Sequence, residues 1–427
     1  MKKDKNIFSG FSKLSYTERL QLLKDQSYIS DEDIHFLKSG GLTSPDLGEK
    51  FVENLMGYFQ IPLGVATQFV IDEIEYVIPM AVEETSIIAA ASKTAKWVRE
   101  FGEIRTEVIG TDIIGQIQFS KVKNFFEFEK QVLQQAHYLI NLANHEVAFG
   151  LVARGGGVTR LTVRELKRDD GLSMAVIHIY MNPCDAMGAN IINQVCEYLK
   201  EPLQKITNEI VTMCILSNLV DSKLTKATIT LKNIDSNLAL KIEEASRFAE
   251  LDSYRAATNN KGVLNGIDPI LIATGNDWRA VEAGLHSYAA RNGRYGSITK
   301  WRYENDVLTG ELIAPLVVGI VGGVTALHPA AKISLKMLKV KKAEDLSRIL
   351  AAVGLVQNLG ALKALTTVGI IEGHMKLHVK NLSLGAGATE KELPLVVKKL
   401  EEILSSTKRI SLSNAIEVLG EFRKKTD

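Results

Sequence analysis

Strand-like and helix-like segments alternate between residues 112 and 218 in an order that few folds allow. Apolar residues that alternate with polar ones predict strands, and apolar residues at spacings of three and four predict helices. In chain order the segments are strand 112–123, helix 124–144, strands 158–167 and 172–181, helix 185–206 and strand 209–218. Strand–helix–strand–strand–helix–strand is the ferredoxin-like order. We therefore expect an α+β multidomain protein in which a ferredoxin-like domain (111–218) is inserted into a larger α/β domain (1–110 and 219–372), with a C-terminal helical flap at 373–427.

The segments outside the inserted domain have weaker patterns. Residues 12–60 are expected to be mainly helical, beginning with a helix that Ser15 caps and Glu18 closes as a capping box. Residues 69–82 alternate and contain many β-branched side chains, which predicts two strands around a turn, and residues 86–100 form a small-residue helix.

Composition limits the class of protein. The chain has 427 residues, which is long enough for two or three domains, and its 46% hydrophobic and 24% charged content is that of a globular protein. The net charge of +1 gives no general attraction to nucleic acid or to an anionic membrane. The three cysteines, Cys184, Cys196 and Cys214, follow no C-x-x-C spacing, which favours a reducing cytoplasm over a disulfide framework or a zinc site.

One segment raises the question of a membrane span. Residues 312–331 contain no Lys, Arg, Asp or Glu, but they include three glycines and two prolines. That density favours a buried strand running into a glycine turn over a spanning helix. No membrane-spanning segment is therefore expected.

An apolar run at 270–273 lies between Lys261 and Asp277 within a stretch rich in Asn and Gly. We interpret this run as a buried strand, which leaves two charged residues near its ends in need of partners.

Several motifs could carry chemistry, and each also has an ordinary structural explanation. Glu83 and Glu84 lie between a strand end and a helix start, where the helix dipole favours carboxylates whatever their function. "DAMGAN" at 185–190 begins a helix after a strand, an arrangement that binds anions but is common. The triple glycine at 155–157 could cradle a phosphate or simply form a turn. His374 and His378 are spaced as metal ligands on a helix, but no third ligand is near, so no metal is expected.

In combination these motifs resemble the bacterial, class II kind of hydroxymethylglutaryl-coenzyme A reductase. The likeness covers nearly the whole length and follows the order of the family. It rests on "ENLMG" (53–57), "VEETSIIAAAS" (82–92), "DAMGAN" (185–190), "ILSN" (215–218), "YRAATNNKGVLNGID" (254–268), "ATGNDWRAVEAG" (273–284), "VGLVQNLGALKAL" (353–365) and "GHMKLH" (373–378).

The resemblance implies that two hydrides from a nicotinamide cofactor reduce a thioester to a primary alcohol, giving mevalonate and free coenzyme A. Lys261 would stabilise the developing oxyanion, and His374 would protonate the departing thiolate. Glu84 would protonate the second alkoxide in a water-poor site, while Glu83 is structural and His378 serves packing or lies at the surface. Asp277 would bridge Lys261 and Glu84, so that Lys261 and Asp277 become each other's partners.

The resemblance also implies binding residues. Arg255 would clamp the free carboxylate of the substrate, because a guanidinium binds a carboxylate through two parallel hydrogen bonds. The other expected substrate contacts are Ser86, Asn218, Asn265 and, on the coenzyme A side, Gln357. The expected dinucleotide contacts from the "DAMGAN" motif are Asp185, Met187, Gly188 and Asn190.

Cofactor preference is predicted from the start of the first helix in the inserted domain. In the family this position approaches the adenosine ribose, and an Asp there accepts the 2′-hydroxyl of NADH. Asn124 occupies it here, preceded by Lys121 and Lys123, so we expect NADPH to be preferred over NADH. The alternative is that the two lysines are simply solvated.

Two residues depart from the family pattern. Thr85 stands where a Pro is usual, which is expected to loosen the turn beside Glu84, and Asn259 stands where a His is common, which is expected to alter a substrate contact. The resemblance further implies a homodimer, or a larger assembly of dimers, with sites between subunits. The same catalytic residues would also serve mevalonate oxidation, and a regulatory protein on this fold is the alternative from another class.

Overall fold

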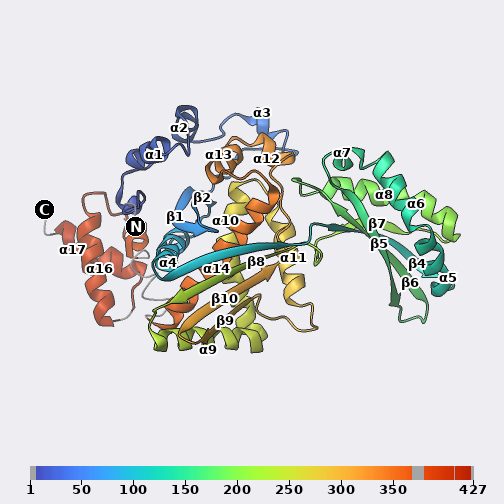
Figure 1. The fold of residues 1–427 in the computed structure, drawn as a ribbon. Helices are drawn as coiled ribbons and strands as arrows, with labels where there is room; N and C mark the ends of the chain where they lie inside the picture. Colours follow the sequence, from blue (N-terminus) through green and yellow to red (C-terminus); the bar gives the residue numbers. More distant parts are fainter. Residues whose placement is uncertain (1–5, 368–378, 408, 425–427) are drawn as a thin grey trace.

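Two four-stranded antiparallel sheets organise the molecule, each with its own hydrophobic core (Figure 1). The computed structural model describes residues 6–367, 379–407 and 409–424. The chain passes from the first sheet to the second between β3 (Gly102–Ile109) and β4 (Ile113–Val122). It returns between β7 (Met213–Ser217) and β8 (Leu224–Lys232). We call residues 113–217 the inserted unit and the part built on the first sheet the large unit.

The inserted unit has the ferredoxin-like arrangement that the sequence predicts. Its sheet has the order β5-β6-β4-β7, and every neighbouring pair is antiparallel. Its other elements are α5 (Phe125–Gln134), α6 (Ala136–Glu146), α7 (Phe149–Val152), β5 (Gly157–Lys167), β6 (Ser173–Asn182) and α8 (Ala189–Thr207). The single helix expected over 124–144 is interrupted at Gln135, which ends α5 and precedes α6. Because α5, α6 and α8 contact the sheet and one another, they cover one face of it.

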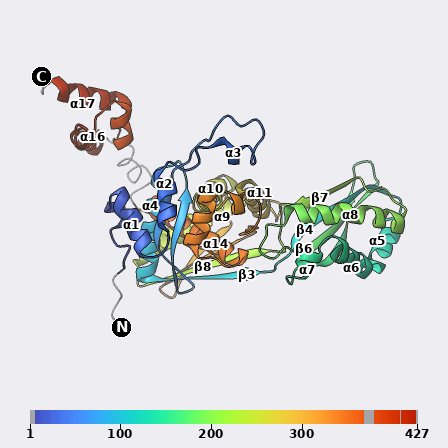
Figure 2. The ribbon, with the colours of Figure 1, turned by 90° about the horizontal axis from the view of Figure 1, so that it is seen from above.

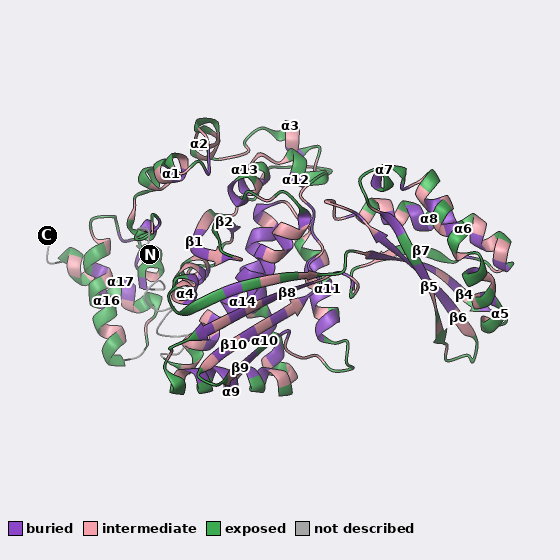
Figure 3. Cartoon of the chain, in the orientation of Figure 1, coloured by how far each residue is buried: buried purple, intermediate pink, exposed green. Residues whose placement is uncertain are grey.

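The large unit is built around one buried helix. Its sheet has the order β3-β8-β10-β9, with β9 at Thr299–Glu304 and β10 at Val307–Ala314. Helix α14 (Ala343–Thr366) packs on β3, β8 and β10 and, on another side, along α10 (Ser253–Ala273). Helices α4 (Ile87–Phe101) and α9 (Ser236–Leu251) also contact α14. Between α10 and α14 in the chain lie α11 (Trp278–Ala289), α12 (Gly323–Leu327) and α13 (Pro329–Leu338). Figure 3 shows α14 and α10 mostly buried at the centre of this unit.

Helix α10 corrects the interpretation of the Asn- and Gly-rich stretch. The apolar run at 270–273 is the last turn of a 21-residue helix, which Asp252 caps by accepting a hydrogen bond from the Arg255 amide. The buried apolar residues Val263, Leu264, Ile267, Ile270 and Leu271 follow helical spacing. A short apolar run does not by itself distinguish a buried strand from a buried helix.

Helix α14 is, among the described residues, the one helix long and apolar enough to pass a test for a membrane span. Since 67% of its apolar window is buried inside the protein, the helix belongs to the core. The uncharged segment 312–331 behaves largely as expected, because β10 runs into an irregular stretch that contains glycines before α12 begins.

The two ends of the chain add smaller elements. β1 (Leu63–Ile71) and β2 (Ile74–Ala81) form the predicted hairpin. The capping box of the first helix is confirmed, since Ser15 and Glu18 exchange hydrogen bonds of 2.7 and 3.3 Å. The helices of the N-terminal region are α1 (Tyr16–Asp25), α2 (Asp31–Lys38) and α3 (Pro45–Gly48), so the expected helical region ends before residue 60. At the other end, α16 (Leu393–Thr407) and α17 (Leu412–Lys424) pack in a hydrophobic cluster of their own.

Candidate active site

A lysine and a glutamate from distant parts of the sequence meet at the face of α10. Glu84 lies in the short connection between β2 and α4, and Lys261 lies in the third turn of α10. The Lys261 Nζ is 3.3 Å from the Glu84 Oε2, which the predicted site requires. The side chains are 62% and 43% exposed, so in a single chain this pair faces solvent rather than a water-poor pocket. Something further must cover it if the site is to exclude water.

Asp277 is held differently from the prediction. Its carboxylate caps α11, accepting hydrogen bonds from the amides of Arg279 (3.1 Å) and Ala280 (3.2 Å). The Arg279 guanidinium lies 3.3 Å from the same oxygen. Lys261 therefore has Glu84 as its partner here, and the expected direct pairing of Lys261 with Asp277 is replaced by a helix cap.

Arg255 has the properties of a site for an anion. It lies in the first turn of α10, and burial lowers the pKa of its guanidinium from the ordinary value. Within the described ranges, no acidic side chain forms an ion pair with it. A half-buried cation without a protein counterion is stabilised by a ligand carboxylate.

Asn265 follows Lys261 by one helical turn and therefore lies on the same face of α10. Four residues later, Pro269 has no N–H to donate to the carbonyl oxygen of Asn265. This leaves a main-chain acceptor near Lys261 without its usual helical donor.

Ser86 and Gln357 lie at the edges of this face. Ser86 is the N-cap of α4, with a backbone φ of 73° that is uncommon outside glycine, and its hydroxyl donates to the Thr85 carbonyl oxygen at 2.5 Å. Gln357, on α14, lies against Gly266, where a Cβ would come within 3.0 Å of the Gln357 Cβ. Its Oε1 is buried without a hydrogen-bond donor in the described protein, so its contribution as a ligand contact stays a prediction.

An apolar cavity lies between the two units and joins two sets of predicted residues. Met187 from the "DAMGAN" segment and Asn218 from the second crossing both line it, together with Ala280 and Val281 of α11. The cavity therefore marks a place where residues of both units meet.

The start of α8 is suited to an anion. Gly188 is its N-cap, with φ +88°, and no described side chain caps the helix. A Cβ at this position would lie 2.5 Å from the Ile113 Cδ1 and 2.6 Å from the Pro183 Cβ. Because no side chain in the described part of the chain caps this end, its first amides remain available to a phosphate. Asn190 in the first turn is exposed.

Asp185 has a structural partner instead of a ligand-facing one. Its Oδ1 accepts a hydrogen bond of 2.9 Å from the Ala343 amide at the start of α14, and its carbonyl oxygen accepts one from Ile320. The side chain thus attaches the "DAMGAN" segment to the large unit. The expected direct contact with the dinucleotide is replaced, for this carboxylate oxygen, by a cap on another helix.

The structure does not bring Asn124, Lys121 and Lys123 to the predicted cofactor site. Ile113, at the start of β4, contacts Gly188, and Asn124 follows the other end of this 10-residue strand. Ten residues of strand span about 30 Å. Figure 2 shows α5 at the end of the inserted unit away from the large unit.

The adenosine ribose of a dinucleotide is bonded directly to its pyrophosphate, so one molecule cannot place its pyrophosphate at Gly188 and this ribose at Asn124. The predicted contacts of these three residues are therefore incompatible with a pyrophosphate at Gly188. The Asn124 side chain instead caps α5 by accepting a hydrogen bond from the Glu127 amide.

One glycine and a cysteine place the backbone of Arg154 at the end of the inserted unit that carries the "DAMGAN" segment. A Cβ on Gly156 would lie 2.5 Å from the Asn182 carbonyl oxygen, so the triple glycine makes the close strand contact considered for it. The Cys184 Sγ lies 3.8 Å from the Arg154 carbonyl oxygen. Arg154 is thereby placed beside the start of the "DAMGAN" segment.

The departure at Asn259 also has a structural explanation. This residue is 2% exposed, and its Nδ2 donates to the hydroxyls of Ser297 (2.9 Å) and Thr299 (3.0 Å). Its Oδ1 accepts from the Asn358 amide at 2.8 Å. Asn259 is enclosed between α10, α14 and β9, so the expectation that it alters a substrate contact is wrong.

Sequence reasoning missed a buried cation at the second crossing. Lys223 is 6% exposed, and burial lowers the pKa of its ammonium, opposed by Glu344, Asp185 and Asp112. Its position between charges from both units has no signal in the sequence, because the three carboxylates come from separate segments.

His374 and His378 lie outside the described residues, so their roles stay predictions. No group of three potential metal ligands occurs in the described part of the chain.

Comparisons with known proteins agree on one family. Residues 15–379 match the family model described as hydroxymethylglutaryl-coenzyme A reductase. The chain is 42% identical over 418 residues to the 3-hydroxy-3-methylglutaryl-coenzyme A reductase of Archaeoglobus fulgidus, covering 97% of this chain and 94% of that protein.

Solved structures from Streptococcus pneumoniae are similar over the same length. A 3-hydroxy-3-methylglutaryl-coenzyme A reductase from that organism superposes with a TM-score of 0.82 at 37% identity, covering 97% of this chain and 99% of the other. A second structure, a class II reductase bound to NADPH in open conformations, gives a TM-score of 0.81 at 37% identity and covers 84% and 100%. The α+β multidomain fold predicted from the sequence is confirmed.

Proposed function

Because the chain belongs to the hydroxymethylglutaryl-coenzyme A reductase family, we propose that it reduces 3-hydroxy-3-methylglutaryl-coenzyme A to mevalonate and coenzyme A with two molecules of NADPH. The contact of Lys261 with Glu84 carries this proposal, since it joins a cation to a carboxyl group that can donate a proton, on the helix that also carries the half-buried Arg255. The test is an initial-rate assay with the purified chain, the thioester and each reduced cofactor. Consumption of two NADPH for each coenzyme A released is expected, and an inactive protein would contradict the proposal.

NADPH, when bound, supplies a hydride to the substrate carbonyl, first at the thioester and then at the aldehyde. The protein must stabilise negative charge on that carbonyl oxygen in both steps. An ammonium held in place by Glu84 can do this without reorganisation, and such preorganised stabilisation is usually the largest catalytic effect. Lys261→Ala should therefore abolish both reductions.

Glu84 and His374 have different tasks in this mechanism. Glu84 would protonate the alkoxide, and its contact with Lys261 keeps it at that oxygen. His374 would protonate the coenzyme A thiolate, which only the thioester step releases. His374→Gln should thus impair thioester reduction much more than reduction of free mevaldehyde, and an equal loss on both substrates would contradict the role given to His374.

Arg255 and Asn265 would hold the substrate relative to Lys261. The guanidinium is half-buried and lacks an acidic partner in the described chain, so the free carboxylate of the hydroxymethylglutaryl group is its natural counterion. Asn218 in the cavity wall and Ser86 beside Glu84 would complete the polar contacts.

For the cofactor, we propose that the pyrophosphate lies on the first turn of α8, above Gly188. The geometry supports this because the helix end has no side-chain cap and the glycine allows close approach. The solved class II reductase from Streptococcus pneumoniae is bound to NADPH. The backbone of Arg154 lies at this end of the inserted unit, and we propose that its guanidinium, rather than Lys121 or Lys123, reaches the cofactor. Arg154→Ala should lower the kcat/KM ratio of NADPH over NADH, whereas Lys121→Ala should leave it unchanged.

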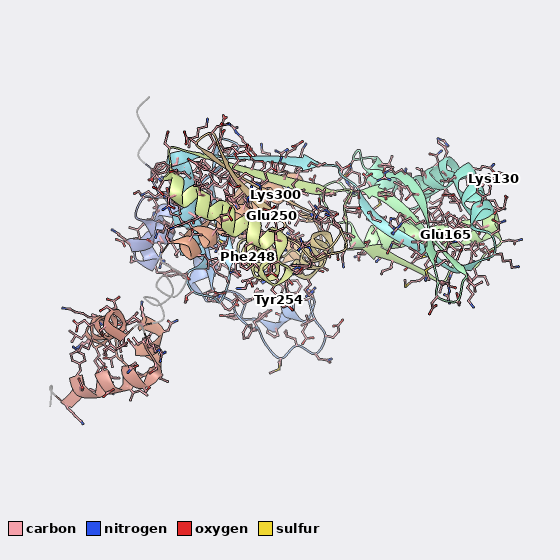
Figure 4. The ribbon with its side chains drawn as sticks, turned by 90° about the horizontal axis from the view of Figure 1, so that it is seen from below. Lys130, Glu165, Phe248, Glu250, Tyr254 and Lys300 are labelled. Carbon is pink, nitrogen blue, oxygen red and sulfur yellow. The ribbon has the colours of Figure 1, made fainter. Side chains whose placement is uncertain are left out.

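We also propose that two copies of the chain form a homodimer that covers this site. Met56 (102% exposed) and Phe59 (94%) project from the segment after α3, and Tyr254 (89%) precedes Arg255. Figure 4 shows Tyr254 and Phe248 on the α9–α10 edge of the large unit. Large exposed apolar side chains next to an open polar site favour an interface there. Analytical ultracentrifugation should give a dimer, and a fully active monomer would refute this assignment.

A further inference from the structure

Helix α10 carries an acidic residue on the same face as Lys261 that the proposed mechanism does not use. Residues 261, 265 and 268 are separated by four and three positions, so Lys261, Asn265 and Asp268 lie in one row along the helix. The positive charge of Lys261 acts on Asp268. Asp268 therefore lies at the inner end of this row, and the catalytic residue Lys261 lies at its outer end.

The carboxyl group of Asp268 is buried against another carboxyl group. Its Oδ1 is inaccessible to solvent and, within the described protein, receives no hydrogen bond from an N–H or O–H donor. Its hydrogen-bond partner is the side chain of Glu282, from the second turn of α11. Two carboxylates in contact cannot both be ionised, so the contact requires a proton between them.

The charges around the pair determine where that proton stays. Burial, followed by the charge of Glu282, raises the pKa of Asp268 to about 8, and Lys261 opposes the rise. Helix α14, which packs along this part of α10, presents apolar residues and the uncharged Gln357. At neutral pH, Asp268 thus keeps its proton and donates it to the Glu282 carboxyl group.

The pair connects the two helices that carry the predicted catalytic residues. Lys261 belongs to α10, and Asp277 is the N-cap of α11, one turn before Glu282. Helices α10 and α11 are joined by a short connection and pack on each other less extensively than α10 and α14 do, so a buried O–H···O bond between them adds to what holds their relative position.

We infer that Asp268 and Glu282 share one proton and form a positioning pair that fixes Lys261 relative to Asp277 for the reduction. This inference rests on the proposed function. The alternative is an ordinary packing contact, whose loss would change stability but not the pH profile of the reaction.

Asp268→Asn and Asp268→Ala separate these possibilities, because an Asn amide donates to Glu282 at any pH while Ala donates nothing. Both variants, wild type and an exposed-acid control, Glu107→Gln, are assayed as full chains from about pH 6 to about pH 10. Asp268→Ala should lose about tenfold to a hundredfold in kcat at neutral pH with little change in either KM. Asp268→Asn should keep most of the wild-type kcat and lack the decline that wild type shows above about pH 8.

An Asp268→Asn variant as impaired as Asp268→Ala, or one with the wild-type alkaline decline, would overturn the inference. Infrared spectroscopy gives a readout that does not depend on catalysis. Wild type at neutral pH should show a carboxylic acid C=O band that is absent from Asp268→Asn, and identical spectra would equally overturn it. An inactive wild type would contradict the proposed function but leave the infrared result to judge the pair.

Discussion

Substitution of Gly188 tests whether the start of α8 is as closely packed as the structure indicates. Gly188→Ala has two costs: a backbone φ of +88° that L-residues avoid, and a Cβ placed 2.5 Å from Ile113 and 2.6 Å from Pro183. Gly171, in the turn between β5 and β6, is a matched control, because its φ is +80° and a Cβ there would have no neighbour within 4 Å. Both glycines belong to the inserted unit, so they share the same background.

The two variants should differ by the cost of steric overlap alone. The left-handed backbone costs about 1–2 kcal/mol for a residue with a Cβ, and this applies to both. Replacing glycine also reduces the entropy of the unfolded chain, which stabilises both folded variants by about 0.4–1 kcal/mol. Forcing a methyl group into a packed site costs about 1–3 kcal/mol more, and this applies to Gly188→Ala only. The expected excess destabilisation of Gly188→Ala over Gly171→Ala is therefore about 1–3 kcal/mol.

Urea unfolding of the full chain, followed by circular dichroism, measures the difference. Because the chain has more than one core, midpoints are compared rather than extrapolated free energies. Gly188→Ala should also raise the KM for NADPH by about tenfold, about 1.4 kcal/mol of binding, while the KM for the thioester changes little. Equal midpoints and equal KM values for the two variants would refute both the packing and the anion site.

Three further measurements test the site. Glu84→Gln should lower kcat by about a hundredfold or more, whereas Glu83→Gln, exposed beside it, should be nearly neutral; equal effects would contradict the assignment. Mass spectrometry after alkylation of the native protein should find Cys184 modified first and protected by NADPH, while Cys196 stays unmodified because burial raises the pKa of its thiol to about 12. The raised pKa of Asp268 (about 8) means that the folded chain holds a proton that the unfolded chain has lost above about pH 4. Stability should therefore fall by up to about 1.4 kcal/mol per pH unit between those values, and urea midpoints of Asp268→Asn should lack this slope.

The inserted unit was predictable because its signals are local. Each strand alternates, each helix has a recognisable start, and the order of six segments is compatible with one sheet arrangement. The interruption at Gln135 was not predictable, since neither Gly nor Pro marks it and the helical spacing continues through it.

The sequence could not show that Asn124, Lys121 and Lys123 lie far from Gly188, because that depends on the direction of a strand. Asn124 does cap a helix after a strand, as expected, but β4 runs away from Gly188. Which end of a strand faces a ligand depends on its pairing with β6 and β7, and pairing partners are distant in sequence. The carboxylates that surround Lys223 were unpredictable for the same reason.

The role of residue 259 was misjudged because the element that carries it was assigned wrongly. With the apolar run taken as a strand, Asn259 and Lys261 belonged to a loop in which both could face the substrate. In a helix, residues two apart point about 200° apart around the axis, so Asn259 must face inward if Lys261 faces the site. The Asn259 side chain accepts one hydrogen bond, from Asn358, and donates two, to Ser297 and Thr299. A neutral imidazole has one donor and one acceptor, so it could not make all three bonds. Asn259 therefore stabilises the packing of α10 against α14 and β9. Through this packing it affects the position of Lys261, rather than contacting the substrate itself.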